Sequence, residues 1–101
     1  MKIVFKLDEV AIAKAEYKIE DVRHTIKNLF AERGLPCVID DGDELAFEDT
    51  GREDDYADMW QIIIGLLKSE WFISSVSSCV WIDEDGEEDV LSQAWKVREF
   101  A

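Results

Sequence analysis

The sequence has few of the residues that enzymes and metal sites use most. It contains one histidine, His24, and two cysteines, Cys37 and Cys79. Its five glycines are isolated, so there is no glycine-rich phosphate loop, and no GxSxG nucleophile motif occurs. His24 falls beside the apolar stripe of an expected helix, which is typical of a solvated side chain. A zinc site would need two distant cysteines and carboxylates. We therefore expect no enzymatic activity, no metal and no cofactor.

Long apolar runs are also missing. No run reaches the ~18 residues that a membrane-spanning helix needs, and the first residues lack the apolar core of a signal peptide. Each cysteine lies in an apolar, strand-like run, which favours burial of two free thiols. One disulfide between neighbouring strands is the alternative, but a single bridge is not the framework of a small secreted protein. These features predict a cytoplasmic protein that does not contact a membrane.

Positive charge is scarce. The chain has 11 Lys and Arg against 24 Asp and Glu, a formal net charge of −13. Phosphate contacts need clustered Lys and Arg, so the charge argues against nucleic acid, and we expect no direct binding of it. The negative excess lies in the last two thirds, because residues 1–34 carry seven basic and six acidic side chains while residues 35–101 carry four and 18.

Length and apolar content predict one folded domain. The chain has 101 residues, of which 48% are hydrophobic, enough for a single core but not for two. We expect a single α+β domain that spans residues 1–101.

Hydrophobic spacing predicts the elements. Apolar residues alternate at 2–7, as in a half-buried strand, and Asp and Gly between two short apolar runs predict a hairpin. Ile19, Val22 and Ile26 follow helical spacing. Residues 8–17 are ambiguous between a helical turn and a loop. The expected strands are 2–7, 36–40, 44–48 and 74–83, and the expected helices are 18–33, 54–68 and 87–100.

The order of these elements predicts a ferredoxin-like α/β plait, βαββαβ, with an additional C-terminal helix. This is a similarity of architecture, and such folds host many unrelated functions. The two main helices should pack on one face of an antiparallel sheet. The expected core is Ile3, Phe5, Val22, Ile26, Leu29, Phe47, Trp60, Ile63, Leu67, Val76 and Val80.

Trp81 is expected on the opposite face of the sheet. Strict alternation over 74–83 places Val76 and Val80 under the helices, and Cys79 and Trp81 on the other side. There Trp81 should lie next to Val4 in an apolar patch. Either the C-terminal helix covers this patch in a monomer, or a second copy covers it in a homodimer.

Acidic residues gather in two runs, 40–58 and 83–89. Three interpretations apply. Turns and helix N-termini attract Asp and Glu, and the charge keeps the protein soluble. A calcium loop is weakly suggested by Asp83-x-Asp85-Gly86, but the remaining ligands of such a loop are missing. The third interpretation is a docking surface for a basic protein.

The third interpretation gives a candidate partner surface. The Asp40–Asp43 hairpin tip should lie at one end of the sheet. Because the third and fourth strands run the same way, the connection 48–55 and the run 83–89 should both lie at the other end. The candidate residues are Glu48, Asp49, Glu53, Asp54, Asp55, Asp83, Glu84, Asp85, Glu87, Glu88, Asp89 and Trp81.

The sequence therefore favours a small, acidic, non-enzymatic interaction module, with an acidic decoy or inhibitor of a basic protein as one form of it. The alternative is a small-ligand-binding protein or an enzyme that uses carboxylates and a tyrosine in a cleft of the plait. Paired carboxylates do acid–base work only where their surroundings separate their pKa values, and turn segments exposed to water do not.

Overall fold

The structure, a computed structural model, describes residues 1–94. Its elements are β1 (Lys2–Leu7), α1 (Glu9–Lys14), α2 (Ile19–Ala31), β2 (Cys37–Asp41), β3 (Glu44–Glu48), α3 (Asp55–Leu67), α4 (Glu70–Ser75), β4 (Val76–Asp83), β5 (Gly86–Asp89) and the 3-10 helix η1 (Leu91–Gln93).

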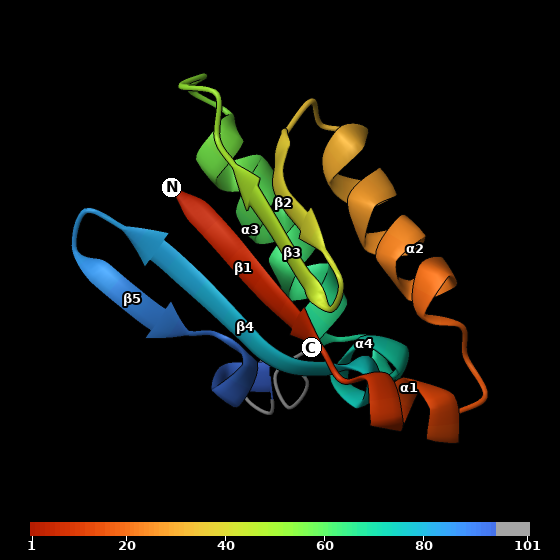
Figure 1. Ribbon diagram of the computed structural model, residues 1–101. Helices are drawn as coiled ribbons and strands as arrows, with labels where there is room; N and C mark the ends of the chain where they lie inside the picture. Colours follow the sequence, from red (N-terminus) through yellow and green to blue (C-terminus); the bar gives the residue numbers. More distant parts are fainter. Residues whose placement is uncertain (95–101) are drawn as a thin grey trace.

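Five strands form one sheet in the order β2-β3-β1-β4-β5, and every neighbouring pair is antiparallel. Helices α2 and α3 lie together on one side of this sheet (Figure 1). The predicted α+β class and the placement of the two main helices are confirmed. The ambiguous segment 8–17 contains the short helix α1, which begins where the Asp8 carboxylate accepts a hydrogen bond from the backbone N–H of Ala11 at 3.0 Å.

The core lies between the sheet and the helices, with Phe5 of β1 at its centre. The Phe5 ring meets Phe30 of α2, Phe47 of β3 and Phe72 of α4 edge to face, with ring centroids 5.8–6.0 Å apart. Phe30 also stacks on Phe47 at 4.0 Å. These contacts tie two strands and two helices together, because aromatic pairs add attraction beyond their buried area.

The predicted facing of β4 is wrong, and a β-bulge explains why. Lys6 pairs with Ser78 and Leu7 with Val76, so Ser77 is an extra residue without a partner on β1. One extra residue shifts the alternation, so Val76 and Cys79 are both buried. Trp81 consequently faces the helices and is 3% exposed, whereas Val80 is only half-buried.

The face opposite the helices accordingly differs from the prediction. Val4 lies between Ala46 and Val80 in the sheet register, while Trp81 lies opposite Ile3. The predicted Val4–Trp81 patch does not form. The homodimer was predicted because Trp81 would be exposed on that patch, and Trp81 is buried on the other face.

The predicted helix 87–100 is also wrong at its start. Glu87–Asp89 belong to β5, which turns back along β4 after a tight turn at Glu84 and Asp85. Gly86 makes this turn with φ of +121°, a conformation that glycine adopts without steric cost. The rest of the predicted helix from residue 95 lies outside the described residues.

Candidate functional site

The ends of β3 and β4 bring the acidic segments 48–55 and 83–89 to the same end of the sheet, as predicted. Lys2 of β1 pairs with Glu48 on one side and with Ile82 on the other, so only one strand separates them. Strands lie about 4.8 Å apart, so Glu48 and Ile82, from which the two acidic segments leave the sheet, lie roughly 10 Å apart. We call the surface formed by the loop 48–55, the turn 83–86 and strand β5 the acidic end; it lies near the N-terminus (Figure 1).

Most of the predicted candidate residues are exposed on the acidic end. Glu48, Asp49 and Asp83 are half-buried. The fully exposed members are Glu53, Asp54, Glu84, Asp85, Glu87, Glu88 and Asp89. Strand β5 carries its three acids along the edge of the sheet beside β4, with Asp89 opposite Val80.

Asp55 does not belong to this surface, because its exposed fraction is 0%. Its Oδ2 accepts hydrogen bonds from the Thr50 backbone N–H at 2.6 Å and the Thr50 hydroxyl at 2.8 Å, and its Oδ1 accepts one from Arg52 Nε at 3.0 Å. The Thr50 backbone N–H is the main reason that the pKa of Asp55 lies below its ordinary value, against the opposing effect of burial. Asp55 therefore fixes the loop rather than facing a partner.

Arg52 connects this loop to the end of α2. Its Nη2 donates to the Arg33 carbonyl oxygen at 2.8 Å. Gly34, with φ of +70°, lies so close to the Arg52 guanidinium that a Cβ there would be 3.2 Å from Nη2. The Arg52 charge is thus held by Asp55 and by backbone, and it neutralises little of the acidic end.

The N-terminal amine binds another acid of this loop. Met1 N lies 2.8 Å from Asp49 Oδ1. This hydrogen bond is the main reason that the pKa of Asp49 lies below its ordinary value. Asp49 is therefore ionised at neutral pH and already paired.

Trp81 does not face a partner either, but it supports an aromatic group beside the acidic end. Its ring lies 4.9 Å from Trp60 and 5.9 Å from Tyr56, both on α3. Its indole N–H donates to Asp83 Oδ2 at 2.9 Å. Tyr56 is 55% exposed and follows Asp54 and Asp55 directly, so an aromatic ring lies next to the acids.

Tyr56 is a surface residue that the sequence pattern does not reveal. Its helical spacing with Met59 and Trp60 is typical of a buried position. Tyr56 lies in the first turn of α3, at the margin of the sheet, where the ring leans on Trp81 with one side and meets solvent with the other. In the sequence, only its position directly after Asp54 and Asp55 hints that Tyr56 is exposed.

Of the remaining acids, some accept hydrogen bonds within the chain and others have no side-chain partner among the described residues. Asp83 Oδ1 accepts from the Asp85 backbone N–H at 2.9 Å, and Glu88 Oε1 accepts from Gln93 Nε2 at 2.6 Å. The carboxylates without a side-chain partner among residues 1–94 include Glu53, Asp54, Glu84, Asp85 and Glu87.

Metal-ligand chemistry has little support in the described part of the chain. Within residues 1–94, no group of three or more His, Cys, Asp or Glu side chains is arranged to hold a metal ion. In the faint calcium pattern, Asp83 instead accepts hydrogen bonds from Trp81 and Asp85.

The cysteines differ from each other. Cys79 is buried as predicted, but Cys37 is exposed, because it lies on the edge strand β2, where only Ile39 is half-buried. Burial raises the pKa of the Cys79 thiol far above its ordinary value, so this thiol stays protonated.

Comparisons of the chain with protein-family models, with curated proteins and with solved structures find no match. Among residues 1–94, no helix has the length and apolar character required to cross a membrane.

Proposed function

We propose that this protein is a small, non-enzymatic interaction module that docks a basic protein through its acidic end. The observation that carries this proposal is the exposed, unpaired carboxylates from two separate chain segments at one end of the sheet, with an exposed tyrosine beside one of these segments. An acidic decoy or inhibitor, which occupies the basic groove of another protein, is a narrower form of the same proposal.

Charge and aromatic surface have different roles in such docking. Opposed potentials steer a basic partner toward the acidic end and raise the association rate. Tyrosine supplies a large, rigid contact with little entropy to lose, which is why it is common at the centres of interfaces. Tyr56 is therefore the proposed anchor, and Glu53, Asp54, Glu84 and Asp85 form the charged rim.

The acids of the acidic end support docking better than they support general acid catalysis. Asp49 and Asp55 have lowered pKa values, opposite to what a general acid at neutral pH needs. The acids with no side-chain partner lie in turns and on an edge strand in contact with water. These observations favour docking over the alternative of acid–base chemistry at this surface.

We further propose that β1–β4 with α2 and α3 are a ferredoxin-like plait, to which β5 adds a fifth strand, and that the protein works in the cytoplasm. The split order of strands and helices supports the first point. The unpaired thiols of Cys37 and Cys79 support the second, because a reducing compartment keeps thiols free.

Capture from cell extract with three baits tests the docking proposal. The first bait is the unchanged protein. The second neutralises the acidic end by Glu53→Gln, Asp54→Asn, Glu84→Gln, Asp85→Asn and Glu87→Gln. The third neutralises five exposed acids elsewhere by Glu9→Gln, Glu16→Gln, Glu20→Gln, Asp41→Asn and Asp43→Asn, so the second and third baits have the same net charge.

Quantitative mass spectrometry should show a basic protein retained by the first and third baits and lost by the second. Retention should also fall as salt is added, because salt screens exposed charges. Equal capture by all three baits, or equal loss from the second and third, would contradict docking at the acidic end.

A further inference from the structure

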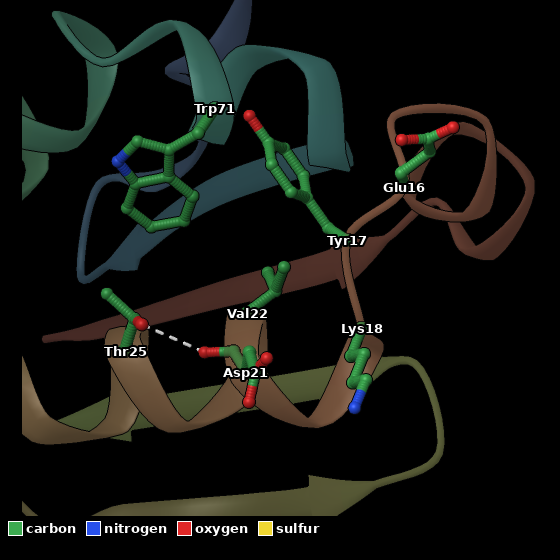
Figure 2. Close-up of a pocket in the computed structure, with 7 residues that line it drawn as sticks. All are labelled: Glu16, Tyr17, Lys18, Asp21, Val22, Thr25 and Trp71. Carbon is green, nitrogen blue, oxygen red and sulfur yellow. Dashed lines mark hydrogen bonds between the residues drawn. The ribbon is translucent and has the colours of Figure 1, made fainter.

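A cavity of about 410 Å³ lies at the opposite end of the molecule, where β1 ends and β4 begins. The connection between α1 and α2, the first turns of α2, and α4 surround it. Its volume is in the range of small-molecule sites. The lining residues are Glu16, Tyr17, Lys18, Asp21, Val22, Thr25 and Trp71 (Figure 2).

Two aromatic rings form its walls. Figure 2 shows Tyr17 and Trp71 on opposite sides of the space, with Val22 of α2 between them at the base. Trp71 packs edge to face on Phe72 of the core, with ring centroids 6.0 Å apart, and so has a fixed position. Tyr17 is 46% exposed although it contributes to the wall. Neither ring is fully buried, so each presents aromatic surface to an occupant.

The polar groups around the rings carry more negative than positive charge. Glu16 and Asp21 contribute carboxylates, and Lys18 contributes one ammonium group. In Figure 2 the Lys18 side chain extends away from the space between the rings. The Thr25 hydroxyl is engaged, because it donates to the Asp21 backbone carbonyl oxygen at 2.8 Å. In the same view the Glu16 carboxylate lies beyond Tyr17 and the Asp21 carboxylate lies on α2 below Val22, so both stand at the rim. The cavity therefore combines aromatic faces with a rim of net negative charge, a pairing that attracts organic cations.

The backbone holds Glu16 and Tyr17 in place at an unusual position. The Tyr17 N–H donates to the Ile12 carbonyl at 3.1 Å, and the Glu16 N–H donates to the Ala13 carbonyl at 3.0 Å. This pair of hydrogen bonds is the Schellman motif, whose left-handed residue is usually glycine. Here that residue is Glu16, with φ of +62°. The backbone at Glu16 thus adopts the left-handed conformation that ends α1, and this fixes where Glu16 and Tyr17 lie at the mouth of the cavity.

We propose that this cavity binds a small organic cation with an alkylated ammonium group, held between the rings of Tyr17 and Trp71. Glu16 and Asp21 supply compensating negative charge from the rim, and Val22 contacts the alkyl groups. This site is separate from the acidic end, so neither proposal depends on the other.

Choline and its neutral isostere 3,3-dimethylbutan-1-ol test the proposal directly, because they differ only in a charged nitrogen against a carbon. Titrations followed by the tryptophan indole N–H and tyrosine ring signals in NMR spectra should show saturable binding of choline. The dissociation constant of the neutral alcohol should be at least about fivefold higher than that of choline, because the alcohol has no positive charge to interact with the aromatic faces. Equal binding of both compounds, or no binding of choline, would overturn the proposal.

Variants locate the site. Tyr17→Leu and Glu16→Gln should each weaken choline binding several-fold, and both are exposed positions at which the fold should survive. Tyr56→Leu is the matched control, since Tyr56 is an exposed tyrosine at the other end. A control that weakens binding as much as Tyr17→Leu, or a Tyr17→Leu protein that binds choline unchanged, would show that choline does not bind between these rings.

Discussion

Asp55 illustrates how one buried acid can organise an otherwise exposed loop. It starts α3, and its carboxylate gathers the N–H groups of Thr50 and Arg52. A buried carboxylate is costly unless hydrogen bonds compensate for the lost water, and here they do. The exposed acids of the loop are thereby held in fixed positions beside Tyr56.

Asp55→Asn should lower the thermal midpoint at pH 7 by several degrees, because an amide cannot accept all the hydrogen bonds that the carboxylate accepts. Since the folded-state pKa lies below the ordinary value of 3.8, the carboxylate's contribution is present above that value and is lost as the pH falls through the folded-state pKa. The difference between the two proteins should thus be constant from neutral pH to about pH 5 and shrink below about pH 4.

Thermal melts over this pH range provide the measurement. Asp54→Asn is the control, because Asp54 is exposed and its side chain makes no capping hydrogen bond. A midpoint difference that stays constant into strong acid would contradict an ionised Asp55 in the folded state.

The two cysteines should react differently with a thiol reagent. In the folded protein, a chromogenic disulfide should modify Cys37 quickly and leave Cys79, which is buried and protonated, unmodified. Both thiols should react once denaturant unfolds the chain. Fast reaction of both thiols in the folded protein would show that β4 opens readily.

The sequence predicted only in part which acids are exposed and which are buried. The acidic runs indicated where charge would gather, and the surface so predicted contained most of the exposed acids. Nothing in the sequence distinguished Asp55 from Asp54, because both lie in one acidic segment. Only the folded loop brings Thr50 and Arg52 around one of them.

Among the elements, the bulge in β4 decides which side chains reach the core. Ser77 has no partner on β1, and its hydroxyl donates to the Lys6 carbonyl at 3.2 Å. After Ser77, the side chains of β4 that would face away from the helices face toward them instead. This shift brings Trp81 beneath Trp60 and Tyr56. The aromatic support of the acidic end therefore depends on one extra residue.

Trp81→Ala should destabilise the fold by about 3–5 kcal/mol, as expected when a large buried aromatic is removed. Val80→Ala, one residue away on the half-buried face, should cost roughly 1 kcal/mol. Urea unfolding of both variants measures the difference. A larger cost at Val80 than at Trp81 would mean that β4 follows the strict alternation after all.

Glu16→Gly should stabilise the protein by about 0.5–1 kcal/mol, because glycine adopts the left-handed conformation without a Cβ clash. Glu16→Ala should bring no such gain, since alanine keeps the clash. The same urea titrations would measure both. A Glu16→Gly protein less stable than the original would indicate that the carboxylate makes a stabilising contact in the fold.

The regular spacing of apolar residues predicted those helices and strands that bury a single face. The strand at 2–7 and the helices at 18–33 and 54–68 closely match β1, α2 and α3, because their apolar residues recur at a constant period. The same reasoning failed for Glu87–Asp89, whose three acids have low strand propensity. The turn at Glu84–Gly86 and pairing with β4 make this segment a strand, and neither is a periodic signal.

At the scale of the whole molecule, two different surfaces lie at opposite ends of the sheet. The acidic end carries exposed carboxylates and Tyr56, and the other end carries the cavity between Tyr17 and Trp71. Acids also lie at the other end of the sheet, where the hairpin 40–44 meets Lys6 of β1. What favours docking at the acidic end over solubility alone is therefore the exposed Tyr56 beside its unpaired carboxylates.

The most direct test of docking at the acidic end is the affinity of the captured basic partner for the three baits, measured by calorimetry at low and at high salt. We expect the unchanged protein and the control with five acids neutralised elsewhere to bind with similar affinity, which weakens as salt is added. The acidic-end variant should bind at least about tenfold more weakly at low salt and show little further dependence on salt. Similar affinities of the two neutralised proteins at every salt concentration would contradict this account.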